Sequence, residues 1–160
     1  MPTAAPTTSR LLPVRSGDAL LSVAVNGITG RLVARLLRLP VGTDTACELA
    51  IEHRPDGSEH WTRRCSVGTW SSTLRPSARG RDRTLCERFG PLNLAFDAEG
   101  RCDGTTAIVL RLRDVRIGRL AIPANALRID VGGVVDPTVT RLGVRLPGGV
   151  ISYEARRAAS

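Results

Sequence analysis

The residue types best suited to chemistry lie in two short stretches of this 160-residue chain, 60–65 and 87–91. If each stretch is a β-strand, alternation places Trp61 and Arg63 on one face of the first and Glu87 on the matching face of the second. An unpaired guanidinium on an apolar face is costly, so Arg63 needs a carboxylate, a ligand or a route to water. We take Glu87 as its candidate partner. The alternative is that the Arg63 head group reaches water at a barrel rim.

The face assigned to Arg63 depends on a predicted hairpin in which residues 45–53 pair with residues 58–66. The intervening Pro-Asp-Gly at 55–57 suits a three-residue hairpin loop. With Arg54 opposite Ser58, polar pairs gather on one face and apolar residues on the other, as cross-strand pairing prefers. The predicted pairs are Glu48 with Arg64, Glu52 with His60, Ile51 with Trp61, Leu49 with Arg63, and Cys47 with Cys65.

The strand predicted over 69–74 places three more side chains on one face, Trp70, Ser72 and Leu74. We expect the set to line a pocket for a lipid-like or acidic apolar ligand, with Arg63 holding a carboxylate or phosphate. The candidate ligand-binding residues are Trp61, Arg63, Trp70, Ser72, Glu87 and Phe89.

Catalysis is the weaker alternative, with Glu87 as the general acid or base of a hydrolase or isomerase. The sequence offers no second carboxylate at a defensible position and no nucleophile elbow, and it places no histidine beside Ser71 or Ser72. The catalytic residues are therefore unknown, and we lean against an enzyme. A structural or interaction domain, in which the cluster only closes the core, stays open as another reading.

Metal and cofactor chemistry has no support in the cysteine pattern. The four cysteines form no CxxC pair and no cluster with zinc spacing, so we expect neither a metal site nor a cofactor. We interpret them as small, reduced, buried residues. They are Cys47, Cys65, Cys86 and Cys102.

The elements that must position these residues are short strands with turn residues between them. The chain is 42% hydrophobic but only 3% aromatic, so one aliphatic core is expected. The pattern predicts a mainly β (α+β) fold, an antiparallel β-barrel or strongly curved sheet of about nine or ten strands. We expect a disordered or loosely docked tail over 1–17, a single domain over 18–155 and a polar end over 156–160.

One amphipathic helix is predicted over about 29–39, begun by Thr29 and ended by Pro40. We expect its apolar stripe to pack on the sheet and its arginines to face water. The alternative is that this basic helix lies on a membrane surface. The stripe is Ile28, Leu32, Leu36 and Leu39, and the arginines are Arg31, Arg35 and Arg38.

The net charge of +8 raises the question of nucleic acid. All 23 basic residues are arginine, and they are spread along the chain without a basic run or a nucleic-acid motif. This distribution favours a solvated, arginine-rich surface over a nucleic-acid footprint. No apolar run approaches the ~20 residues of a transmembrane helix. With no secretory signal in the sequence, we expect a cytoplasmic protein.

Several of these pieces together resemble a bacterial family, domain of unknown function 4166. The most specific are W-x-R at 61–63 and E-R-F-G-P at 87–91, and the likeness covers about residues 17–155. The other matching pieces are Gly30-Arg31-Leu32, Leu39-Pro40-Val41-Gly42, Ile122-Pro123 and Tyr153. The resemblance implies no established activity, but it implies a possible partner, a saccharopine-dehydrogenase-like, nucleotide-binding module. The chain itself has no GxGxxG fingerprint after a strand.

Overall fold

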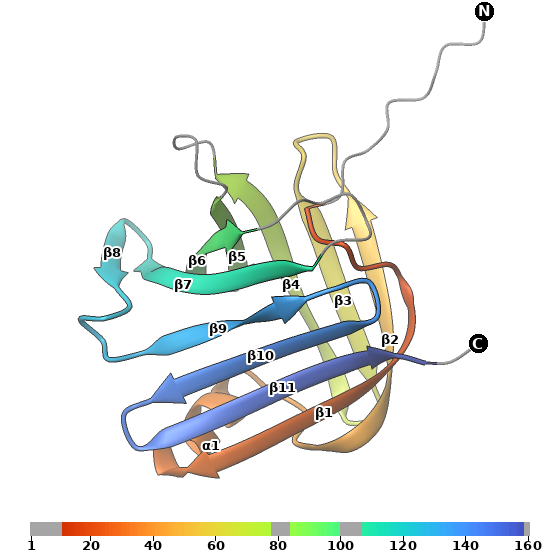
Figure 1. The fold of residues 1–160 in the computed structure, drawn as a ribbon, viewed down its shortest axis with the longest axis horizontal. Helices are drawn as coiled ribbons and strands as arrows, with labels where there is room; N and C mark the ends of the chain where they lie inside the picture. The colour runs from red at the N-terminus through yellow and green to blue at the C-terminus, as the bar shows by residue number, and fades with distance from the viewer. Residues whose placement is uncertain (1–10, 78–83, 100–106, 159–160) are drawn as a thin grey trace, which may run out of the picture.

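Ten antiparallel strands of the computed structural model close into a β-barrel, and one more strand lies against its side (Figure 1). The structure describes residues 11–77, 84–99 and 107–158. The elements in chain order are β1 (Gly17–Gly27), α1 (Ile28–Leu36), β2 (Gly42–His53), β3 (Glu59–Cys65), β4 (Gly68–Ser77), β5 (Thr84–Phe89), β6 (Leu92–Glu99), β7 (Ile108–Ile117), β8 (Leu120–Pro123), β9 (Asp130–Val135), β10 (Val139–Leu146) and β11 (Gly149–Arg157).

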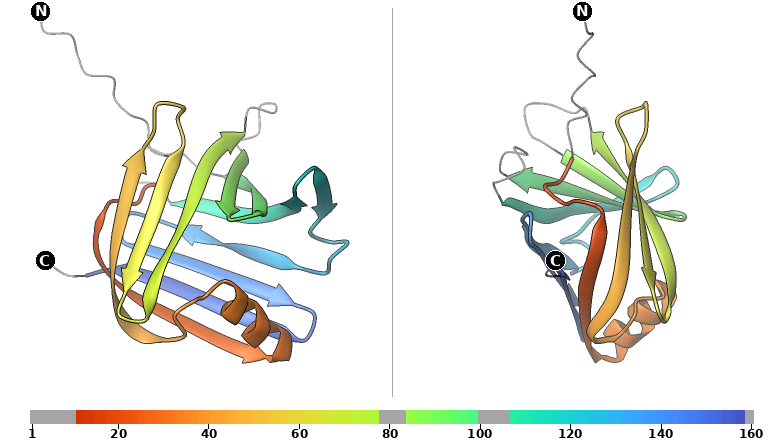
Figure 2. Two further views of the ribbon diagram at one scale, coloured as in Figure 1. Left: turned by 180° about the vertical axis from the view of Figure 1, so that it is seen from behind. Right: turned by 90° about the vertical axis from the view of Figure 1, so that its right-hand side faces the viewer.

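The barrel is an up-and-down meander. Strands β1 to β7 pair in chain order, β9, β10 and β11 follow, and β11 pairs back with β1, while β8 pairs with β7 alone. Closure leaves the ten barrel strands without a free edge, which removes the usual template for aggregation. Strands β2 to β5 cross β1, β11, β10 and β9 at a steep angle, so the barrel is flattened into two layers (Figure 2). The predicted barrel is confirmed, and the open curved sheet is not.

The register of the first hairpin is also as predicted. Cys47 faces Cys65, Leu49 faces Arg63, and Ile51 faces Trp61. The Arg54 N–H donates to the Ser58 carbonyl at 2.8 Å, which closes the predicted loop. Because side chains alternate between the two faces of a strand, this register fixes which residues of β3 face the barrel interior.

The core follows the same alternation. On β7, Ile108, Leu110 and Leu112 are buried, while the intervening Val109 and Arg111 are exposed. Each large aliphatic side chain removed from water contributes about 1.5–3 kcal/mol to stability. Two clusters share the interior, one spanning β3 to β9 and the other lying between β1, β2, β11 and α1.

The expected N-terminal tail proves to be part of the barrel from residue 11 onward. Leu11 and Leu12 are buried in the larger cluster, Pro13 is buried too, and the Ser16 hydroxyl accepts a hydrogen bond from the Ile51 N–H at 2.9 Å. This segment has no alternation of polar and apolar residues, so its sequence pattern does not predict that it packs against the core. At the other end, β11 continues to Arg157, two residues past the predicted domain end. Residues 1–10, Cys102 and 159–160 lie outside the described residues.

The predicted helix is present over Ile28–Leu36, but most of its predicted core stripe points to solvent. Ile28, Leu32 and Leu36 are 75%, 62% and 81% exposed, while Leu39, just beyond the helix, packs against the core as predicted. Gly30 and Ala34 face the barrel instead. At nine residues the helix is far from a membrane span, and no helix within the described ranges is long and apolar enough for one.

Backbone contact at the start of β11 explains this orientation. A Cβ at Gly149 would lie 2.3 Å from the backbone nitrogen of Gly30, so the helix and the strand touch main chain to main chain. Small residues permit this close approach, and a leucine on that side of the helix would prevent it. The Thr29 hydroxyl, expected to cap the helix, instead donates to the Pro147 carbonyl at 2.7 Å.

Candidate functional site

The barrel encloses a cavity of about 190 Å³, and five of the six predicted ligand-binding residues line it. Ser72 lies directly behind them, hydrogen-bonded to two of the five. The remaining lining is mainly aliphatic side chains from both layers of the barrel. Cavities for drug-sized molecules measure ~300–1,000 Å³, so this one suits a short chain or a single ring. The five lining residues are Trp61, Arg63, Trp70, Glu87 and Phe89.

Three adjacent strands bring the polar members of the site together. Arg63 on β3 donates from Nη1 to the Ser72 hydroxyl on β4 at 3.1 Å. That hydroxyl donates to Oε1 of Glu87 on β5 at 2.7 Å, and Arg63 Nη2 lies 3.7 Å from the same oxygen. The Arg63 and Glu87 side chains are 12% and 16% exposed, so the predicted ion pair is present and largely shielded from water.

The guanidinium of Arg63 also lies between two indole rings. Its Cζ is 5.3 Å from the ring centroid of Trp61 and 5.5 Å from that of Trp70. A cation within about 6 Å of a tryptophan face is stabilised by the ring quadrupole, more strongly where water is excluded. The two rings therefore hold the arginine in place within an otherwise apolar cavity.

Tyr153 on β11 reaches the cluster from the opposite layer, and the predicted site set lacks it. Burial raises the pKa of the Tyr153 phenol above its ordinary value, and interaction with the Arg63 guanidinium opposes this shift only in part. The phenol thus stays neutral at physiological pH and offers a hydroxyl to the cavity. The strand that carries Tyr153 was predicted. The alternation within one strand, however, does not show which of its residues will meet residues from the opposite layer of the barrel.

A second interior carboxylate, Glu59, was missed altogether. It is 2% exposed, accepts the Leu11 N–H at 2.8 Å and the Trp61 indole N–H at 2.9 Å, and lies 3.4 Å from His53 Nδ1. Strand alternation could have revealed it, because Glu59 precedes Trp61 and Arg63 by two and four positions and therefore shares their face of the strand. It fixes the Trp61 ring and ties the N-terminal segment across one end of the barrel.

The two opposed cysteines complete the interior of the first hairpin. Burial, together with a hydrogen bond to Cys65, raises the pKa of the Cys47 thiol to about 12. At neutral pH this thiol is protonated, and the thiolate is the reactive form, so Cys47 is a packing residue and no nucleophile. Across the ranges that the structure describes, no three His, Cys, Asp or Glu side chains gather in a way that could hold a metal ion.

Part of the cavity lining comes from the place where the start of β1, the β9–β10 turn and the end of β11 lie side by side, which we call the mouth (Figure 1). Its lining there includes exposed residues, namely Arg15, Asp18, Thr138 and Arg157. Asp136 shapes this mouth by accepting hydrogen bonds from the N–H groups of Thr138 and Val139 at 2.7 and 2.8 Å. The mouth is therefore polar, and the apolar interior with its arginine lies behind it.

Comparisons with known proteins leave the family open: no family model, curated protein or solved structure matches the chain. The resemblance to domain of unknown function 4166 therefore stays a prediction.

Proposed function

We propose that this protein is a binding module that encloses one small lipid-like molecule in its barrel, with the ligand's polar group at Arg63. The observation that carries the proposal is an arginine in an apolar cavity whose ion pair is loose. Charge-assisted N–H···O bonds normally measure ~2.7–2.9 Å. The 3.7 Å separation between Arg63 Nη2 and Glu87 Oε1 is longer than such a bond, so Glu87 does not saturate the five N–H donors of the guanidinium.

The charge balance of the site narrows the ligand class. Arg63 and Glu87 form a pair without net charge, and Tyr153 is neutral. A bound anion would add an uncompensated negative charge to an apolar interior, which is strongly unfavourable. The site therefore suits a short apolar ligand with an uncharged polar group, or an acid that binds with its proton.

Two probes of equal chain length, octanol and octanoic acid, test this ligand class. We expect octanol to bind with an affinity independent of pH, and octanoic acid to bind more tightly as the pH falls. Glu87→Gln leaves the Arg63 charge unmatched and should improve octanoic acid binding at neutral pH by about tenfold, equivalent to ~1.4 kcal/mol. Calorimetry measures both affinities, and mass spectrometry of an organic extract of the purified protein identifies any ligand carried along.

Arg63 and Arg64 provide a matched pair of variants, since they are adjacent on β3 and face opposite sides of the barrel wall. Arg63→Met should weaken octanol binding about tenfold to a hundredfold, because it removes a hydrogen bond from a charged group and such bonds typically contribute this much to affinity. Arg64→Met, whose partner Glu48 is 56% exposed on the outside, should bind like the wild type. Full binding by Arg63→Met would remove Arg63 from the site. A clean extract, with neither probe bound, would overturn the binding module.

A further inference from the structure

The outward face of α1 carries an apolar row, defined as Ile28, Leu32 and Leu36. All three side chains are more than half exposed, and Val41 just beyond the helix is 61% exposed. A contiguous patch of large exposed apolar side chains is unusual on a soluble protein and marks a surface that meets another apolar phase.

A second row, of arginines, runs directly beside the first. Successive residues of a helix are 100° apart, so Arg31 and Arg35 each lie one step round the helix from Leu32 and Leu36. Arg31, Arg35 and Arg38 are exposed, and none forms an ion pair with a carboxylate of the described residues. Residues 19–43 contain no Asp or Glu at all, so the charge of this surface is uniformly positive.

The helix cannot turn to hide its leucines, because its inner face is fixed by main-chain contact. Gly27 has φ 78°, and a Cβ there would lie 2.2 Å from the Gly148 carbonyl oxygen. The close approach of Gly30 to Gly149 fixes the next turn. In the views of Figure 2 the helix lies at the end of the barrel where β1 ends and β2 begins. The apolar row and the arginine row are thus a fixed feature of the surface.

We propose that this surface docks the protein on a bilayer that contains anionic lipids. The apolar row would enter the boundary between head groups and acyl chains, and the arginines would reach the lipid phosphates along their aliphatic stems. A second copy of this chain fits poorly, since its face would bring one arginine row against another. Nucleic acid would engage the arginines and leave the apolar row in water.

This inference does not depend on the ligand proposed above. The two features are neighbours in the fold, because Leu37 and Leu39, which directly follow α1, are among the residues that line the cavity.

Co-sedimentation with lipid vesicles tests the docking surface. We expect the full chain to sediment with vesicles of phosphatidylcholine and phosphatidylglycerol, to release at high salt, and to stay in solution with phosphatidylcholine alone. Leu32→Ser with Leu36→Ser should abolish sedimentation. Arg31→Gln with Arg35→Gln should weaken vesicle binding about thirtyfold, because this is the affinity that two basic residues typically add near an anionic surface.

Matched controls come from the β7–β8 hairpin, where Ile117 and Leu120 are 56% and 60% exposed. Ile117→Ser with Leu120→Ser, and Arg111→Gln with Arg119→Gln, make the same changes in polarity and charge and should sediment like the wild type. The proposal is overturned if the wild type ignores anionic vesicles, or if control and helix variants lose binding equally. It is also overturned if light scattering finds a dimer that Leu32→Ser with Leu36→Ser dissociates.

Discussion

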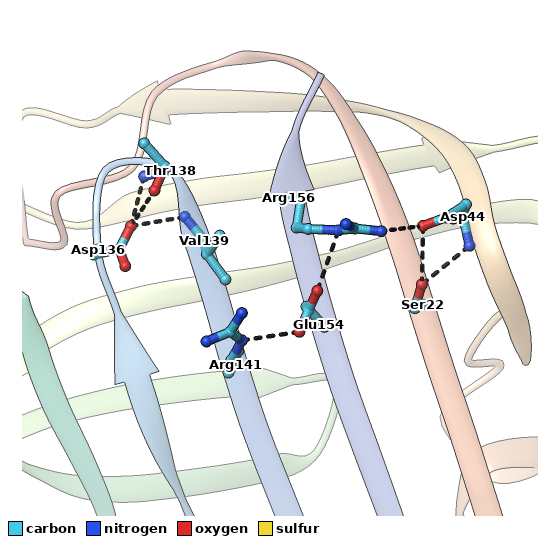
Figure 3. A network of polar contacts seen from close by, with 8 residues as sticks. All are labelled: Ser22, Asp44, Asp136, Thr138, Val139, Arg141, Glu154 and Arg156. Atoms are coloured by element: carbon cyan, nitrogen blue, oxygen red, sulfur yellow. Dashed lines mark hydrogen bonds and ion pairs between the residues drawn. The ribbon is translucent and has the colours of Figure 1, made fainter. Parts of the chain in front are cut away.

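Arginine–carboxylate pairs occur in two regions of this barrel with opposite surroundings. Inside, Arg63 and Glu87 are separated by 3.7 Å and are largely shielded from water. Outside, a network crosses β10, β11, β1 and β2, in which Arg141 bonds Glu154 at 2.8 Å and Arg156 links Glu154 to Asp44 (Figure 3). The outer pairs have the shorter N···O distances, while the inner pair lies in surroundings of lower dielectric constant.

The comparison teaches that geometry does not rank these pairs by energy. Coulomb attraction between charges 4 Å apart is about 1 kcal/mol in water and several times larger at the effective dielectric of a protein site. Exposed pairs also lose side-chain entropy and are screened by salt. We therefore expect the long inner pair to matter more than the short outer ones, both for stability and for function.

The largest effect is expected where one inner partner is removed. Arg63→Met leaves Glu87 in the cavity without its cation but still hydrogen-bonded to the Ser72 hydroxyl, and an uncompensated shielded charge destabilises a fold by about 3–5 kcal/mol. Arg141→Met, on the 68% exposed outer arginine, should stay within about 0.5 kcal/mol of the wild type. Urea unfolding followed by tryptophan fluorescence measures both.

A double variant separates the cost of the orphaned charge from that of lost packing. Arg63→Met with Glu87→Leu removes both charges and should regain most of the lost stability, because apolar replacements of buried pairs are often neutral. Equal instability of the single and double variants would mean that the arginine contributes through its packing between the two indoles.

The second largest effect concerns Glu59, the other interior carboxylate. In Glu59→Gln an amide NH₂ replaces one carboxylate oxygen, so either the Leu11 N–H or the Trp61 indole N–H faces a donor. An unsatisfied buried donor costs about 1–3 kcal/mol. We also expect faster proteolysis near Leu11, since that segment loses its tie. Glu48→Gln, on the outer face of the same hairpin, is the control, and equal loss in both variants would contradict this interpretation.

A smaller, pH-dependent effect is expected at the cavity mouth. Partial burial raises the pKa of the Asp136 carboxyl, but hydrogen bonds from Thr138 and Val139 outweigh this effect and keep that pKa below its ordinary value (Figure 3). A lowered folded pKa gives stability that is present above the unfolded pKa of about 3.9 and is lost as the pH falls through the folded one.

Asp136→Asn keeps the acceptor oxygen but loses the charge, which should cost about 1 kcal/mol at neutral pH. The difference from the wild type should shrink below about pH 4, as thermal unfolding across that range would reveal. A gap that stays constant with pH would assign the loss to the turn geometry instead.

Strand alternation is the part of this fold that the sequence predicted well. One turn, Pro55-Asp56-Gly57, set the hairpin register, and the register placed Arg63 inside and Arg64 outside. The contact with Glu87 followed because the predicted strand around it had the same alternation. These are local patterns with a period of two, and neighbouring strands of a meander inherit them.

What escaped prediction depends on contacts between segments far apart in the chain. Apolar spacing favoured burial of Leu32 and Leu36, but the approach of Gly30 to Gly149 decided which helix face meets the barrel. Tyr153 joins the site only because β11 closes the barrel on β1. The helical spacing of apolar residues shows that a helix is amphipathic, but it does not show which of its faces packs against the rest of the protein.

The smallest effect is expected in the outer network itself. Glu154 accepts from Arg141 at 2.8 Å and from Arg156 at 3.1 Å, so Glu154→Gln breaks two ion pairs in a single change. Exposed pairs are each worth about 0.2–1 kcal/mol, and at 1 M salt the screening length falls to about 3 Å. The variant should therefore lose under about 1 kcal/mol at low salt and match the wild type at high salt. If Glu154→Gln instead remained as unstable as Arg63→Met in 1 M salt, short exposed pairs would outweigh the shielded one, and the contrast between inside and outside would fail.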